Sequence, residues 1–330
     1  MRNRKGISVV TARPSENQLA DLTVYAISQQ LSKDYRTAIT DTRIAKILFD
    51  VAKNLELPIT RSWYKYGTYV WWSDNASEKR LKEFLGILPP TSDTNVTVNL
   101  ANGEMKALYD QIFGLVSKHK LMLREDISIF LTELYKNEAP KGLGTLYLAN
   151  KKLVDRCDKV LDSIWKNDPG PQFMIVSREV TDLHKALFNF KDMQEMIDLV
   201  IDGTSLLEDM LITYETNQDD LSKLKEFAKV FEEVFNFYKD NIWTFPASAI
   251  AIRTVDGPRA SQVKDNRSSY LMEAPQYRDK VSELSGAVLS KGFYPTRENI
   301  MIVQERMSKR LSSDQKALKQ VFAEQLLVRR

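Results

Sequence analysis

Cysteine and histidine are nearly absent from this chain. Cys157 is the single cysteine, and His119 and His184 are the two histidines among 330 residues. One thiol excludes an intramolecular disulfide framework and a zinc site with several thiolate ligands, and it indicates a reducing, cytoplasmic compartment. Two histidines make a histidine-rich metal centre hard to build. We interpret Cys157, which lies in a charged helical segment with no histidine near it in sequence, as a packing residue.

The motifs of several enzyme classes are also missing. The sequence has no phosphate-binding loop ending in glycine, lysine and serine or threonine, and no Gly-x-Ser-x-Gly nucleophile elbow. The acidic run from Asp198 to Asp220 fits no calcium-loop spacing. We interpret this run as a solvated helix face or a patch for a basic partner, with a divalent metal site as the less favoured alternative. The sequence therefore favours a protein that is not an enzyme, and we assign no catalytic residue, no metal ligand and no cofactor.

Glycine and proline are scarce, and long apolar runs do not occur. The 12 glycines and 11 prolines are few for a fold with many tight turns, and a charged share of 28% suits helices with solvated faces. No segment has the roughly 18 to 20 consecutive apolar residues that cross a membrane. We expect no membrane contact and an all-α, multi-helix fold of two helical domains with at most a minor β element. The net charge of +3 does not discriminate between classes of partner.

Helix signals recur along the chain. Ser15 and Gln18 have the spacing of a capping box, and apolar residues follow at intervals of three and four. A second helix is predicted after Thr40, with the apolar stripe Ile44, Ile47, Leu48, Val51, Ala52 and Leu55. Residues 221–242 give the most regular helical pattern. The polar segment 253–270 shows no such pattern and is predicted to be irregular, and long ordered loops of this kind are often functional.

Two proline-rich stretches divide the pattern. Pro89-Pro90 predicts a boundary between an N-terminal helical module, residues 1–90, and a larger helical domain, residues 91–330. Asp168-Pro169-Gly170-Pro171 predicts a joint near 168–171 within the larger domain. Between these stretches, the alternating Val96, Val98 and Leu100 predict one strand.

Residues 61–72, RSWYKYGTYVWW, hold six aromatic side chains, two cations and a glycine. Aromatic residues bury large areas and stack on rings or guanidinium planes, so two interpretations are open. In the first, Trp63, Tyr66, Tyr69, Trp71 and Trp72 fasten the first helices together while Gly67 permits a tight turn. In the second, Arg61, Tyr64 and Lys65 stay exposed and contact phosphate or a partner. The two are compatible, because alternate residues of an extended segment face opposite ways.

Residues 44–72 resemble a known family at this point. An apolar helix followed by Trp63-Tyr64-Lys65-Tyr66-Gly67-Thr68-Tyr69 is similar to the helix and W-Y-x-Y-G-P-Y motif of Panacea-type antitoxin domains and related prokaryotic helical proteins, with Thr68 in the place of their proline. The resemblance covers under a tenth of the chain. It implies a prokaryotic helical module associated with toxin neutralisation or genome defence, and it carries over no catalytic residue.

These observations lead to one preferred function and one alternative. We expect a non-enzymatic interaction protein of a prokaryotic defence or toxin–antitoxin system that binds a protein partner through helical surfaces and the aromatic cluster. The alternative is a DNA- or RNA-binding protein that uses the basic N-terminal arm, the aromatic cluster, the 253–267 segment and the basic C-terminal helices. The candidate binding residues for either ligand are Arg61, Trp63, Tyr64, Lys65, Tyr66, Tyr69, Arg253, Arg259, Lys264 and Arg267.

Overall fold

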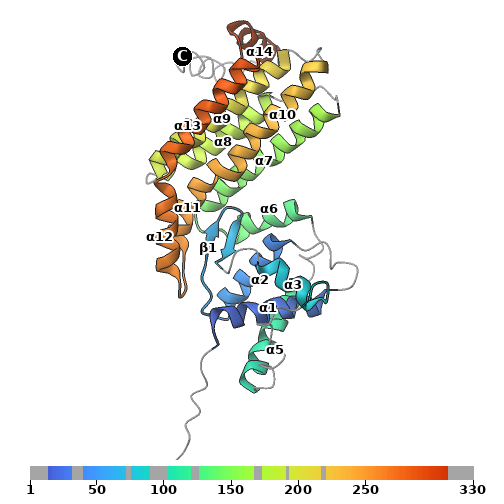
Figure 1. Ribbon diagram of the computed structural model, residues 1–330, viewed down its shortest axis with the longest axis vertical. Helices are drawn as coiled ribbons and strands as arrows, with labels where there is room; N and C mark the ends of the chain where they lie inside the picture. The colour runs from blue at the N-terminus through green and yellow to red at the C-terminus, as the bar shows by residue number, and fades with distance from the viewer. Residues whose placement is uncertain are drawn as a thin grey trace, which may run out of the picture. The chain divides into compact units, whose positions relative to one another are not determined.

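The computed structural model describes residues 14–31, 40–71, 76–89, 103–119, 126–166, 173–190, 193–216 and 221–310. Most of the described chain is helical, and the one sheet within it is a two-stranded hairpin (Figure 1). This confirms the predicted all-α fold class with a minor β element. The chain divides into two compact units, a first unit of residues 1–131 and 251–265 and a second unit of residues 132–250 and 266–330.

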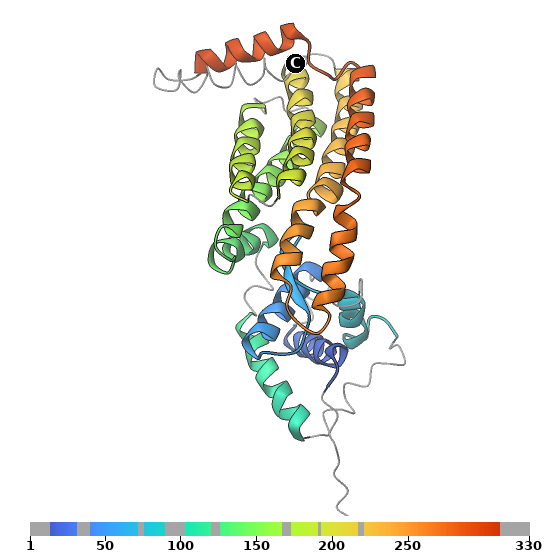
Figure 2. The same ribbon diagram turned by 90° about the vertical axis from the view of Figure 1, so that its left-hand side faces the viewer.

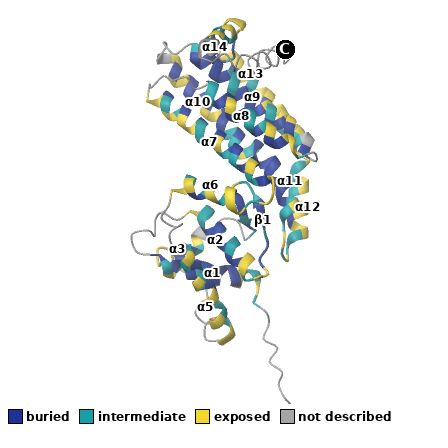
Figure 3. Ribbon diagram, turned by 180° about the vertical axis from the view of Figure 1, so that it is seen from behind, coloured by how far each residue is buried: buried dark blue, intermediate teal, exposed yellow. Residues whose placement is uncertain are grey.

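The first unit is built around a buried helix. Its elements are α1 (Glu16–Gln30), α2 (Asp41–Asn54), β1 (Arg61–Tyr64), β2 (Gly67–Val70), α3 (Ala76–Phe84) and α5 (Gly103–Lys118), with parts of α6 (Ile127–Asn137), α11 (Thr244–Thr254) and α12 (Ala260–Leu271). Helix α1 packs against α2, α3 and α5. Figure 3 shows the middle of α1 as buried.

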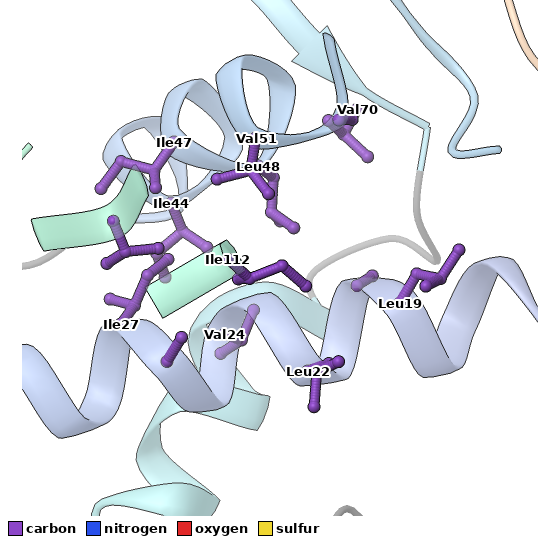
Figure 4. Close-up of a cluster of buried hydrophobic side chains, with 14 of the residues drawn as sticks. Leu19, Leu22, Val24, Ile27, Ile44, Ile47, Leu48, Val51, Val70 and Ile112 are labelled. Carbon is purple, nitrogen blue, oxygen red and sulfur yellow. The ribbon is translucent and has the colours of Figure 1, made fainter. Parts of the chain in front are cut away.

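The predicted capping box begins α1. The Ser15 hydroxyl accepts a hydrogen bond from the Gln18 backbone N–H at 3.3 Å, and the Gln18 side chain accepts one from the Ser15 N–H at 2.8 Å. Both bonds satisfy donors that an open helix end leaves unpaired. The α2 stripe then meets α1 in a common apolar core, to which β2 contributes Val70 and α5 contributes Ile112 (Figure 4).

The first unit does not end at the boundary predicted near residue 90. Helix α5 follows that boundary, yet Ile112 and Val116 on α5 are fully buried in the same core as α1 and α2. The proline pair therefore interrupts the helical pattern without ending the packed unit. The predicted strand 96–100 and the predicted joint 168–171 lie outside the described residues.

The second unit contains long helices that run side by side (Figures 1 and 2). Its elements include α7 (Leu143–Trp165), α8 (Phe173–Phe188), α9 (Gln194–Thr216), α10 (Leu221–Phe237), α13 (Ala274–Ser290) and α14 (Arg297–Arg310). Helix α7 packs against α8 and α10, and α9 packs against α8, α10, α13 and α14. Most of the predicted acidic run lies on α9, where Asp198 pairs with Arg278 at 3.4 Å.

The helix predicted over residues 221–242 is confirmed, with a change of geometry at its end. Helix α10 passes at Tyr238 into a π-helical turn, Tyr238–Ile242, and α11 follows. Within this turn the buried Tyr238 hydroxyl donates a hydrogen bond to the Asn150 side chain of α7 at 2.7 Å. This bond satisfies a phenol that would otherwise lose its water on burial.

The prediction that residues 253–270 are irregular is wrong. Helix α11 continues to Thr254, and α12 begins at Ala260, directly after the Gly257-Pro258 turn. Val263 is the buried residue of α12, and most of the other side chains of this helix are exposed or half-buried. A helix exposed on most sides has no apolar stripe, so hydrophobic periodicity does not reveal it.

Candidate functional site

The aromatic cluster forms the β1–β2 hairpin. The strands pair antiparallel with Arg61 opposite Val70, Ser62 opposite Tyr69, Trp63 opposite Thr68 and Tyr64 opposite Gly67. Lys65 and Tyr66 make the turn. Gly67 follows the turn with φ of +87°, a left-handed conformation that glycine adopts without steric strain. The tight turn expected at Gly67 is thus present.

The two faces of the hairpin differ. Trp63, Thr68 and Val70 are buried, and β2 packs on α2. The opposite face carries Tyr64, Tyr69 and Trp71, which we call the aromatic face. Its ring centroids are 5.0 to 5.5 Å apart in edge-on or tilted contact, the arrangement that aromatic quadrupoles favour. The Trp71 indole N–H donates to the Ser62 hydroxyl at 2.8 Å and fixes the ring on this face.

The tip of the hairpin is its most exposed part. Tyr66 is 42% exposed, and the Lys65 ammonium lies 5.9 Å from the centre of the Tyr66 ring. The sequence grouped Tyr66 and Trp63 in one structural set, but only Trp63 is buried, at 4% exposure. Trp72, the last aromatic of the cluster, lies outside the described residues.

Arg61 is engaged within the first unit. Its backbone N–H and C=O bond to the C=O and N–H of Asp256, both at 2.9 Å, and its guanidinium pairs with the Asp256 carboxylate at 2.8 Å. The guanidinium also donates to the backbone oxygens of Leu57 and Ile59. On the same edge of β1, the Trp63 N–H donates to the Thr254 hydroxyl at 2.9 Å. The Arg61 side chain is consequently only 17% exposed.

Arg259 is engaged in the same unit. Its Nε donates to the Glu16 carboxylate at 2.8 Å, its backbone N–H donates to the Thr60 hydroxyl at 2.9 Å, and its guanidinium donates to the Trp71 backbone oxygen. The second Glu16 oxygen accepts the Thr60 N–H at 2.5 Å. Arg259 thus links the start of α1 to Thr60, which precedes β1, and to Trp71, which follows β2.

The remaining candidate cations are Arg253, Lys264 and Arg267. Arg253 and Lys264 are exposed, at the end of α11 and on α12. Arg267 belongs to the second unit, where its guanidinium lies 5.9 Å from the Tyr270 ring. The basic N-terminal arm and residues 311–330 lie outside the described residues. The structure therefore brings the hairpin together with Arg259, through contacts that the sequence did not predict.

Lys46 is a further residue that the sequence analysis missed. Its ammonium donates a hydrogen bond from α2 to the Thr68 backbone oxygen, on the edge of β2 away from β1. Lys46 is only 5% exposed, and this burial lowers the pKa of its amine from 10.5 to about 7. The Thr68 hydroxyl beside it is buried with no hydrogen-bond partner. Lysine faces water in most helices, so no sequence signal identifies this buried one.

The prediction that Cys157 is a packing residue is supported by its full burial on α7. Burial raises the thiol pKa, and the neighbouring Asp158 raises it further. Since the thiolate is the nucleophile, we expect a disulfide reagent such as Ellman's reagent to leave the native protein unmodified at pH 8 and to react fully in denaturant. Stoichiometric labelling of the native protein within minutes would contradict this assignment.

The described residues contain neither a candidate metal site nor a candidate membrane span. Within the described ranges no group of three or more histidine, cysteine, aspartate or glutamate side chains is placed to hold a metal ion. In the same part of the chain no helix has the length and apolar character needed to cross a bilayer.

No curated protein and no solved structure matches this chain. A family model does match, and it covers residues 13–317, which include most of both compact units. The chain therefore belongs to the family described as domain of unknown function DUF8098.

Proposed function

We propose that this protein is a non-enzymatic interaction protein that holds a protein partner at the β1–β2 hairpin, through the aromatic face and the Lys65-Tyr66 tip. Tyrosine and tryptophan are enriched among the residues that contribute most to protein–protein affinity, because they bury a large area with few rotatable bonds. Here the aromatic residues come from a hairpin whose backbone is fastened on both edges, by Asp256 and Thr254 beside β1 and by Lys46 beside β2. Such a surface loses little conformational entropy on binding.

The engagement of the cations is the observation that carries this proposal over nucleic-acid binding. A surface that binds nucleic acid needs cations that can neutralise phosphates. These cations then displace the counterions that surround the nucleic acid. Arg61 and Arg259 instead pair with Asp256 and Glu16, both within the first unit. Their guanidinium groups would have to break these pairs to bind phosphate. The part of the site that offers side chains to a partner is therefore mainly aromatic.

We also propose the biological setting. The resemblance of residues 44–72 to Panacea-type antitoxin domains supports a role in a prokaryotic toxin–antitoxin or defence system, in the cytoplasm. In the structure this stretch is helix α2 followed by the hairpin, the same order of features that carries the resemblance. The partner proposed on this basis is a toxin-like protein encoded with the chain.

The tip gives the test of the proposed function. We expect Lys65→Glu and Tyr66→Ala to abolish copurification of the partner while leaving the thermal unfolding transition unchanged, because the two residues form the turn, where Tyr66 is exposed and Lys65 is half-buried. Affinity purification of the full-length chain, with the neighbouring gene products coexpressed, measures this. Lys106→Glu, with the same change of charge at an exposed position of α5, is the matched control and should retain the partner.

Three outcomes decide against the proposal. Partner binding that survives both tip substitutions places the contact elsewhere. Loss of the thermal transition in Lys65→Glu makes Lys65 a structural residue. A shift of labelled DNA or RNA by the purified chain that weakens steeply with salt, without a copurifying protein, favours the nucleic-acid alternative.

A further inference from the structure

Residues 254–259 form a segment that we call the strap. The strap runs along the edge of β1, where Thr254 bonds to Trp63 and Asp256 bonds to Arg61, and it ends at Arg259. In the sequence this segment was part of a predicted irregular loop with exposed cations. In the structure it supplies the neighbour that the outer edge of β1 would otherwise lack.

Arg259 forms hydrogen bonds with the residue before the hairpin and with the residue after it. Thr60 directly precedes β1, and Trp71 directly follows β2. The two are joined by a hydrogen bond from the Trp71 N–H to the Thr60 oxygen at 2.8 Å, and Arg259 bonds to the Thr60 hydroxyl and to the Trp71 oxygen. The open end of the hairpin is therefore closed by one residue from a distant part of the chain, through its backbone N–H at Thr60 and its guanidinium at Trp71.

Glu16 fixes the direction of the Arg259 guanidinium. One carboxylate oxygen of Glu16 accepts from Arg259 and the other accepts from the Thr60 N–H. The Glu16 side chain is only 12% exposed, so its charge is largely withdrawn from water and favours a charged partner. Arginine suits this position because its planar fork can reach Glu16 and the Trp71 oxygen together, whereas a lysine ammonium is a single point.

We propose that Arg259 is a positioning residue of the interaction site, which sets the placement of Trp71 and thereby the shape of the aromatic face. This inference rests on the proposed function and deepens it: partner binding at the hairpin depends on the strap as well as on the residues that touch the partner. Trp71 is the member of the aromatic face that directly follows β2. Its backbone is held by Thr60 and Arg259.

Hydrogen–deuterium exchange of the full-length chain tests the inference without a partner. In Arg259→Met we expect the amides of Arg61, Trp63 and Trp71 to exchange at least about tenfold faster, with the amides in the middle of α1 unchanged. Arg259→Lys should fall between the wild type and Arg259→Met, because it restores the charge without the fork. Lys106→Met removes one positive charge from an exposed position of α5 and is the control, with no change at the hairpin.

Two exchange patterns would overturn the inference. Equal acceleration throughout the first unit would mean that Arg259 contributes only to global stability, and no acceleration at the hairpin would mean that it positions nothing. If Arg259→Met does not fold, Glu16→Gln gives the second test. This variant keeps an acceptor for Thr60 and removes the charge that orients Arg259, and we expect the same local pattern at about threefold faster exchange.

Partner affinity is the second readout, and it separates the two proposals. If the partner is found, Arg259→Met should weaken its binding at least about tenfold while Lys106→Met does not. Unchanged affinity despite faster hairpin exchange would overturn the link between the strap and the site. If no partner binds the hairpin, the proposed function fails, while the exchange experiment still decides whether Arg259 positions the aromatic face.

Discussion

Lys46→Met is expected to remove a pH dependence of stability that the wild-type protein shows between pH 7 and 8.5. Burial lowers the pKa of Lys46 from 10.5 to about 7 in the folded state. Above pH 7 the unfolded chain therefore binds more protons than the folded chain at this residue, so the free energy of unfolding rises with pH. The slope is about 1.4 kcal/mol per pH unit, or about 2 kcal/mol over this range. Below pH 7 the amine is protonated in both states and contributes no slope.

Methionine fills a similar volume without a titrating group. At pH 7 the substitution removes the free-energy cost of a buried charge but leaves the Thr68 backbone oxygen without its donor, which itself costs about 1 to 3 kcal/mol. We expect a net stabilisation of about 2 kcal/mol at pH 7 from these opposing terms. Urea denaturation at several pH values measures both effects, and Lys106→Met on an exposed position of α5 is the control that should keep the wild-type slope. The same slope in Lys46→Met would assign the pH dependence to another group.

The parts of the fold that the sequence predicted are those set by neighbours in the chain. The capping box at Ser15 lies within four residues, and the α2 stripe repeats within two turns, so both follow from local geometry. The hairpin was only partly predicted. Its turn at Gly67 and its aromatic content were identified, but the pairing of Tyr64 with Tyr69 and Trp71 follows from a register that composition does not give.

The parts that were not predicted depend on distant residues. Arg61 and Asp256 are 195 positions apart, and each taken alone is an ordinary charged residue. Pro246 and Pro258 made α11 and α12 harder to predict from the sequence, because proline usually interrupts a helix. Pro246 lies in the first turn of α11, where a missing N–H has no helical acceptor to lose, and Pro258 precedes α12. Both prolines therefore accompany helix starts here.

Long-range contacts also explain why the candidate site offers fewer cations to a partner than the sequence predicted. The sequence grouped Arg61 and Arg259 with exposed cations because it does not show which acidic residue each one pairs with in the fold. Folding places Asp256 beside Arg61 and Glu16 beside Arg259, so two cations of the predicted basic surface form ion pairs within the first unit. The side chains that remain for contact with a partner are those of the aromatic face and of the Lys65-Tyr66 tip.

Gly257→Ala is expected to destabilise the first unit by about 3 kcal/mol, because two separate effects act at this position. Gly257 has φ of +118°, a conformation that residues with a Cβ rarely adopt. A Cβ atom here would also lie 2.6 Å from the Thr60 Cα and 2.9 Å from the Ile59 oxygen. Both contacts are with backbone, so no side-chain rotation relieves them. The close approach is what lets the strap reach β1.

Gly286→Ala is the matched control for this substitution. Gly286 lies on α13, where an added Cβ meets nothing within 4 Å. Alanine favours the helix over glycine, so this variant should be more stable by about 0.5 to 1 kcal/mol. Opposite signs for the same chemical change would show that the loss at position 257 comes from the positive φ and the close contact with Thr60 together, and not from alanine itself. If Gly257→Ala is as stable as the wild type, the strap does not need this close approach, and Arg259 would have to hold the hairpin without it.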